Sequence, residues 1–328
     1  MSRALPLWKR PLAAASRARR RISEEPRAPA PFVVGVNRSG TTLLRLMLDS
    51  HPEMTIPPET HFVPEMIRLA RRDNTTRKRL VRAATDHPRW GDFGLDEGVL
   101  LERLQAVKPL DPAGALRAFY DLYAEKEGKP RWGDKTPRYM RAMPRIERAL
   151  PEARFIHLIR DGRDVALSQA ERALDGEAPE LAEVAERWRR RIETARVHSA
   201  DLDHYLEVRY EDLVGTPDRT LRGICDFIEL PYDDAMLSYH ERAAERLTEM
   251  DRDLGSPDKG PVRTGDERLA GHAMTAEPPT TDRCGRWREE MAAADVAEFE
   301  RVAGSLLEDL GYELSASVGS HPGGDESR

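Results

Sequence analysis

The segment from Gly35 to Thr42 combines two glycines, a cation and three hydroxyl groups. It has the spacing Gly-x-x-x-x-Gly and joins a short apolar run to an amphipathic pattern of helical period. Glycines let the backbone turn and approach a ligand closely, and the free N–H groups at a helix start bind phosphate. The segment therefore predicts a phosphate-binding loop, with these residues on the ligand: Arg38, Ser39, Gly40, Thr41 and Thr42.

The residue after Gly40 is Thr41, where nucleoside-triphosphatases with this spacing have a lysine. That lysine contacts the β and γ phosphates, and the following hydroxyl binds magnesium. Arg38 and the paired threonines suit a nucleotide with a single 5′-phosphate group and require no metal. Taken alone, the segment also fits an ordinary strand-to-helix turn with a solvated arginine.

A second cluster of polar residues begins at Arg160, directly after a short apolar run. Ligands of open α/β sheets bind beyond the carboxyl ends of the strands, where Arg160 stands. Ser168 and Arg172 are four residues apart, so they share one face of the helix that we expect to follow. Together the three residues predict a second phosphate site, and a solvated Arg/Asp turn is the alternative.

Short β-like runs alternate with longer helical patterns, which indicates an α/β domain whose mostly parallel sheet is flanked by helices. We expect strands at 32–36, 154–159 and 204–208. Amphipathic periodicity predicts helices at 41–49, 64–72, 113–127, 138–150, 181–200, 217–228 and 294–310. The stretch 250–279 is rich in Gly, Pro and Asp and is expected to be a long irregular loop.

The 328 residues carry a net charge of −6, which argues against bulk nucleic-acid binding. Residues 1–30 form a basic arm expected to be flexible, residues 31–314 the enzymatic domain, and residues 315–328 a disordered tail. The arm has no apolar run long enough for a signal peptide or a membrane span. The two cysteines, Cys225 and Cys284, lie far apart without metal-ligand spacing. These features predict a cytoplasmic protein without a transmembrane segment.

These segments resemble the sulfotransferases that use 3′-phosphoadenosine-5′-phosphosulfate (PAPS), most closely the tyrosylprotein sulfotransferases and their bacterial relatives. The resemblance runs in order from about Phe32 to Tyr312. Beyond the two phosphate clusters it rests on these runs: Pro58-Glu59-Thr60, Asp134-Lys135-Thr136-Pro137, Arg209-Tyr210-Glu211-Asp212-Leu213 and Gly285-Arg286-Trp287. It implies a three-layer, P-loop-like fold and sulfuryl transfer from PAPS to a hydroxyl group.

The resemblance also implies roles for individual residues. The loop residues would hold the 5′-phosphosulfate, Arg160 and Ser168 the 3′-phosphate, and Arg172 a further basic position. Tyr210 would lie against the nucleotide, Lys135 near the transferring group, and Glu59 at the position of the catalytic base. The tyrosylprotein enzymes carry an arginine two residues after that base, where this chain has His61.

Several alternatives remain open at this level. His61 is a rival base, since imidazole is the commonest one, and Glu59 alone could instead favour the start of a helix. A P-loop kinase for a small molecule would need magnesium and the missing lysine. A catalytically inactive nucleotide-binding module is a third reading. The acceptor hydroxyl could belong to a tyrosine, a phenolic metabolite, a sugar or a lipid.

Overall fold

A computed structural model describes residues 27–171, 180–254, 264–270 and 272–315. The remaining residues, which include most of the basic arm and nearly all of the expected tail, lie outside this description. Within the described residues, no helix has both the length and the apolar character needed to cross a membrane.

The central sheet has four parallel strands in the order β4-β1-β5-β6. Their bounds are β4 (Asp134–Lys135), β1 (Ala30–Gly35), β5 (Ala153–Ile159) and β6 (Tyr205–Arg209). In the register, Val33 of β1 pairs with Lys135 on one side and Ile156 on the other. The three expected strands are confirmed within two residues at each end. The two-residue strand β4 was not expected, because an Asp-Lys pair has no β-like pattern.

Side chains alternate along the strands and supply two apolar faces. Phe32 and Val34 enter one core with Phe155, while Val33 enters the other with Ile156 and Leu158. All of these side chains are buried. A parallel sheet that is apolar on both faces must be covered on both, which accounts for the layered architecture.

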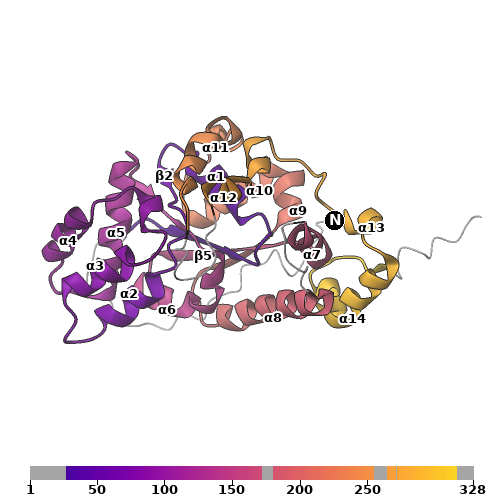
Figure 1. The fold of residues 1–328 in the computed structure, drawn as a ribbon, viewed down its shortest axis with the longest axis horizontal. Coiled ribbons are helices and arrows are strands. Elements are labelled where there is room, and N and C mark those ends of the chain that lie inside the picture. The colour runs from indigo at the N-terminus through magenta and orange to yellow at the C-terminus, as the bar shows by residue number, and fades with distance from the viewer. Residues whose placement is uncertain (1–26, 172–179, 255–263, 271, 316–328) are drawn as a thin grey trace, which may run out of the picture.

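Helices cover the two faces of the sheet, and Figure 1 shows α8 along one side and α1, α10 and α11 on the other. The first core is completed by α2 (Val63–Ala70), α3 (Arg77–Thr85), α4 (Glu97–Ala106), α5 (Pro112–Lys126), α6 (Met143–Ala149), α8 (Leu181–Ser199) and α14 (Ala293–Asp309). The second is completed by α1 (Thr41–Asp49), α9 (Tyr210–Gly215), α10 (Pro217–Ile228) and α11 (His240–Leu247). The fold is the expected three-layer, P-loop-like α/β arrangement.

Smaller elements complete the chain. A parallel pair joins β2 (Met54–Thr55) and β3 (Arg131–Trp132). The remaining helices of the described residues are η2 (Trp90–Phe93), η3 (Pro137–Arg141), α7 (Gly162–Ala170), η4 (Asp234–Met236), η5 (Thr248–Met250), α12 (Gly265–Ala270), η6 (Ala273–Ala276) and α13 (Trp287–Glu290).

Two expectations about local structure are wrong. The single helix expected at 138–150 is divided into η3 and α6, with the break at Ala142. Pro144 explains the break, because its ring clashes with the carbonyl four residues earlier in a continuous helix and it has no N–H to donate. The segment 250–279, expected to be irregular, contains α12 and η6 among its described residues.

Candidate active site

The phosphate loop connects the end of β1 at Gly35 to the start of α1 at Thr41. Its backbone is left-handed at Arg38, with φ 75°, and at Gly40, with φ 87°. This conformation is ordinary for glycine and uncommon for arginine, so the surrounding structure must hold Arg38 in it. At Gly35 the constraint is space, because a Cβ atom would lie 2.6 Å from the carbonyl oxygen of Leu158.

Ser39 lies at the base of the loop and is fully buried. Its backbone N–H donates to the Val36 carbonyl at 3.1 Å. Its Oγ has no hydrogen-bond partner among the described residues. Buried polar atoms are nearly always paired, and an unpaired hydroxyl beside the start of a helix is open to a bound anion or a water molecule. The loop therefore fits an oxygen-rich anion.

Tyr210, the first residue of α9, closes the loop from the side. A Cβ atom at Gly40 would lie 2.4 Å from a carbon of the Tyr210 ring, so only glycine fits beneath it. The guanidinium of Arg160 lies 4.7 Å from the centroid of the same ring, within the range of a cation–π contact. Tyr210 thus links the loop to the second basic cluster.

The two predicted phosphate clusters are in direct contact. Arg38 Nε donates to Ser168 Oγ at 3.0 Å, and Arg160 Nη1 donates to the Arg38 carbonyl at 3.1 Å. Arg160 Nη2 donates to the Arg283 carbonyl at 2.6 Å. Arg160 Nε is buried without a partner among the described residues. Arg172, predicted as a further cation, lies outside the described residues.

A second group of predicted residues gathers around Glu59. Lys135 Nζ donates to Glu59 Oε1 at 2.7 Å and lies 3.4 Å from Thr42 Oγ1 of the loop. His61 Nε2 lies 2.9 Å from Glu59 Oε2, and Arg89 Nη2 lies 3.7 Å from the same oxygen. Both oxygens of the carboxylate are thus engaged by cations or hydrogen bonds.

These contacts decide the protonation of the pair. Burial alone would raise the pKa of Glu59, but Lys135, His61 and Arg89 together bring that pKa well below its ordinary value. Burial is also the largest influence on Lys135, and it lowers the pKa of the ammonium group despite the attraction of Glu59. The ring of His61 stacks on His87, whose pKa burial and nearby positive charges lower to about 4. Glu59 is therefore held as a carboxylate at neutral pH.

A buried polar network fixes the backbone beside Glu59. Thr60 Oγ1 donates to Asp134 Oδ2 at 2.7 Å and lies 2.7 Å from the Tyr139 hydroxyl. The Thr60 N–H donates to Thr136 Oγ1 at 3.1 Å. Tyr120 donates to Asp134 Oδ2 at 2.8 Å. Because these groups flank Lys135 along the chain, the network holds the Glu59–Lys135 pair in register.

Glu59 does not cap a helix. The helix that follows it, α2, starts at Val63 with Phe62 at the capping position, and Glu65 is the acid in its first turn. Arg89 was not singled out from the sequence. It lies 30 residues from Glu59 between a proline and a tryptophan, and nothing in that run indicates a site.

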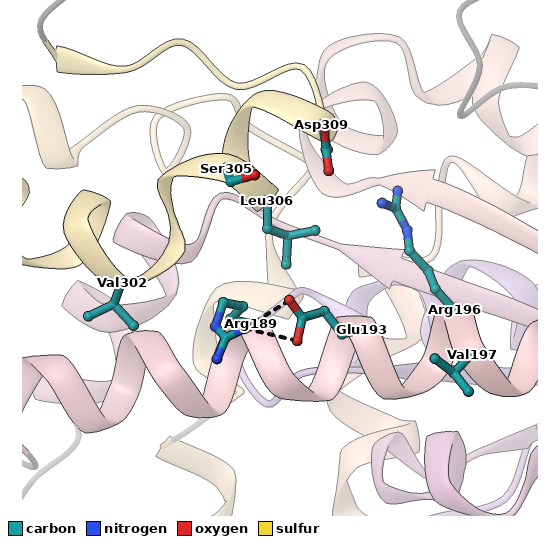
Figure 2. Close-up of a pocket in the computed structure, with 8 residues that line it drawn as sticks. All are labelled: Arg189, Glu193, Arg196, Val197, Val302, Ser305, Leu306 and Asp309. Atoms are coloured by element: carbon teal, nitrogen blue, oxygen red, sulfur yellow. Dashed lines mark hydrogen bonds and ion pairs between the residues drawn. The ribbon is translucent and has the colours of Figure 1, made fainter.

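Two cavities lie apart from the Glu59 group. A groove of about 460 Å³ lies between α8 and α14 (Figure 2). In it Arg189 Nη1 contacts Glu193 Oε1 at 3.0 Å. None of the predicted site residues lines it. A second cavity of about 310 Å³ is lined by residues adjoining Arg160 and Tyr210, among them Asp161, Glu211 and Cys284.

Comparisons with known proteins identify the family of this chain. Residues 29–234 match a family model described as the sulfotransferase family. Protein-tyrosine sulfotransferase 1 of Danio rerio is 29% identical over 219 residues, which are 65% of this chain and 56% of the relative. The protein-tyrosine sulfotransferase of Drosophila melanogaster is 25% identical over 296 residues, or 88% of this chain and 52% of the relative. The chain thus spans about half the length of these relatives.

Solved structures support the fold. The sulfotransferase domain of the Synechococcus PCC 7002 olefin synthase aligns with a TM-score of 0.54 and 24% identity, covering 90% of this chain and all of that domain. The sulfotransferase domain of the curacin biosynthetic pathway aligns with a TM-score of 0.55 and 21% identity over 88% of this chain.

The prediction of a cytoplasmic location is wrong when judged against these relatives. The protein-tyrosine sulfotransferases that this chain resembles are enzymes of the Golgi membrane. Two unpaired cysteines and a short uncharged run are local features of a chain, and they do not determine the compartment in which an enzyme of this family works.

Proposed function

This chain belongs to the sulfotransferase family, and we propose that it transfers a sulfuryl group from PAPS to an acceptor hydroxyl. One observation carries the proposal. The phosphate loop and the second basic cluster form a single anion site, because Arg38 contacts Ser168 and Arg160 contacts the Arg38 carbonyl. A nucleotide with phosphates at both its 5′ and 3′ positions fills such a site, whereas a nucleoside diphosphate fills one half of it.

The buried atoms without partners support the same ligand. Ser39 Oγ lies in the loop and Arg160 Nε in the second cluster, so each half of the site offers a hydrogen-bonding atom that no described residue satisfies. We assign the 5′-phosphosulfate to Arg38, Ser39, Gly40, Thr41 and Thr42, and the 3′-phosphate to Arg160 and Ser168. Tyr210 offers its ring to the nucleotide.

PAPS supplies an activated sulfuryl group whose leaving group is a phosphate. Arg38 and Lys135 place positive charge where negative charge develops, which is the main way that proteins accelerate such transfers. Lys135 is suited to this because it lies within 3.4 Å of Thr42 in the loop and carries its charge in a buried position. Glu59 accepts the proton of the acceptor hydroxyl as the new O–S bond forms.

The Glu59–Lys135 contact implies a sequence of events in this mechanism. While Lys135 neutralises Glu59, the carboxylate is a weak base because its pKa is low. An anion beside Thr42 attracts Lys135 and weakens its hold on Glu59, so the pKa of Glu59 rises when the co-substrate is in place. The base is then strongest when transfer can occur.

A phenolic hydroxyl suits this base better than an aliphatic one. A tyrosine hydroxyl has a pKa of about 10 and needs less help to lose its proton than a sugar or lipid alcohol. Relatives of this chain are named protein-tyrosine sulfotransferases. We therefore propose a tyrosine or another phenol as the acceptor.

Binding measurements with the desulfated product PAP test this proposal. PAP should stabilise the protein without magnesium, and more than ADP does, because only PAP engages both clusters. Arg160→Gln should cost about 1.5–3 kcal/mol of PAP binding in calorimetry, the range for a hydrogen bond to a charged group, and leave ADP binding nearly unchanged. Equal affinities for PAP and ADP in the wild type, or a need for magnesium, would contradict the proposal.

A further inference from the structure

Arg89 lies between two carboxylates that belong to different parts of the fold. Its Nη2 is 3.7 Å from Glu59 Oε2, and its Nη1 is 3.8 Å from Asp92 Oδ2. The Arg89 side chain is 20% exposed, like that of Glu59 at 22%, whereas that of Asp92 is 1% exposed. The guanidinium therefore connects the buried Asp92 carboxylate to the partly exposed carboxylate of Glu59, the proposed base.

Asp92 is itself fixed by α12, which lies more than 170 residues later in the chain. Arg268 donates to both Asp92 oxygens, at 3.1 and 2.5 Å, and its Nη1 also donates to the Arg252 carbonyl at 2.8 Å. The Arg268 side chain is 4% exposed. This buried bidentate pair with Arg268 already neutralises the charge of Asp92. The longer contact between Arg89 and Asp92 therefore serves to orient the Arg89 side chain and is not needed to neutralise Asp92.

The side chains around Glu59 divide between its two oxygens. Lys135 contacts Oε1 from the side of the phosphate loop, and His61 and Arg89 contact Oε2 from the opposite side. His87 stacks on His61, and its Nδ1 accepts from the backbone N–H of Arg89 at 3.3 Å. When Lys135 turns toward an anion in the loop, Arg89 is the cation that stays beside Glu59.

We infer that Arg89 is a positioning residue for the transfer reaction, oriented through Asp92 by Arg268 of α12, and that it fixes the place and ionisation of Glu59. The inference rests on the proposed function insofar as Glu59 is the base. In this proposal α12 influences the active site indirectly, through Arg268 and Asp92.

The pKa of Glu59 in the free protein tests this inference without any enzymatic assay. It can be followed by NMR in protein labelled with carboxyl-13C glutamate, with the signal identified by its loss in Glu59→Gln. Arg89→Gln should raise this pKa by about 1 unit, since an opposite charge within about 4 Å lowers a carboxyl pKa by about 1–3 units. Arg89→Lys keeps the charge and should leave the pKa of Glu59 close to its wild-type value. Arg82→Gln, an exposed arginine on α3, is the control for charge loss.

The link through Asp92 gives a second test. Arg268→Gln leaves Asp92 without its bidentate partner, so Arg89 should turn toward Asp92 and the pKa of Glu59 should rise as it does in Arg89→Gln. The double variant should then show no further rise, because both changes act through one guanidinium. The acid limb of kcat/KM for a phenolic acceptor should move to higher pH in the same variants, while PAP affinity stays within threefold.

The outcomes separate the two proposals. An unchanged Glu59 pKa in Arg89→Gln overturns the positioning role and leaves the sulfotransferase proposal standing. Additive shifts in the double variant overturn the link through α12. A wild-type protein that binds no PAP overturns the proposed function, and the NMR titration still decides whether Arg89 controls the ionisation of Glu59.

Discussion

Replacing Glu59 by glutamine keeps the shape of the side chain and removes its capacity to accept a proton. In the structure both carboxylate oxygens are engaged, by Lys135 at 2.7 Å and by His61 at 2.9 Å. The amide of glutamine can keep the first contact through its oxygen and the second through its NH2 group. The change therefore alters charge more than packing. A general base contributes about 10²–10⁴-fold to a rate, so kcat should fall by that factor.

The same substitution has a predictable effect on stability. Lys135 is 3% exposed, and it loses the negative charge that compensates its own. Removing one member of a fully buried ion pair costs about 3–5 kcal/mol, and the partial exposure of Glu59 reduces this to about 1–3 kcal/mol. The melting temperature of the variant should fall, and PAP should still bind, because Glu59 makes no contact with the Arg38 and Arg160 clusters.

The assay is steady-state sulfation of a phenolic acceptor, together with calorimetry of PAP binding and melting curves. Glu65→Gln is the matched control, since Glu65 lies six residues later on α2, its side chain is 44% exposed and it pairs with Arg68. Loss of affinity for PAP equal to the loss of rate would refute the reasoning. Turnover within threefold of wild type, with chemistry limiting the rate, would move the base to His61.

The other predictions concern the loop and the core. Gly40→Ala should weaken PAP binding by at least about tenfold, because its φ of 87° is strained for alanine and the new Cβ would lie 2.4 Å from Tyr210. Gly128→Ala introduces a comparable strain, at φ 67°, where nothing lies within 4 Å, so calorimetry should find unchanged PAP affinity in that control. His157 is fully buried, and burial lowers its pKa from 6.5 to about 4. As the pH falls, the unfolded chain takes up a proton at His157 before the folded protein does. The contribution of neutral His157 to the free energy of unfolding is therefore complete above pH 6.5 and declines by about 3 kcal/mol as the pH falls to 4. Denaturant titrations across this range should show a flatter dependence in His157→Gln, and an equal slope in both proteins would contradict the assignment.

The sequence by itself determined the layered fold and the phosphate loop, because both depend on local patterns. Short β-branched or aromatic runs at 32–36 and 154–159, bounded by turn or charged residues, indicated strands, and the helices at 41–49 and 217–228 lie where their periodicity placed them. The Gly-x-x-x-x-Gly spacing located the loop, since a strand, a turn and a helix start adjoin along the chain. Residue types alone also named Arg160 and Ser168.

Only the tertiary structure decided which of these residues meet. Glu59 and Lys135 are 76 residues apart, and they come together because β4 pairs with β1. With only two residues, β4 is too short to show a pattern in the sequence. Pro144 divided a helix that periodicity alone had joined. Arg89 and Arg268 carry no signal in their own segments, and their proximity to Glu59 and Asp92 follows from the packing of η2 and α12. Contacts between distant segments are set by the whole fold, because a side chain's partner depends on where every intervening element packs.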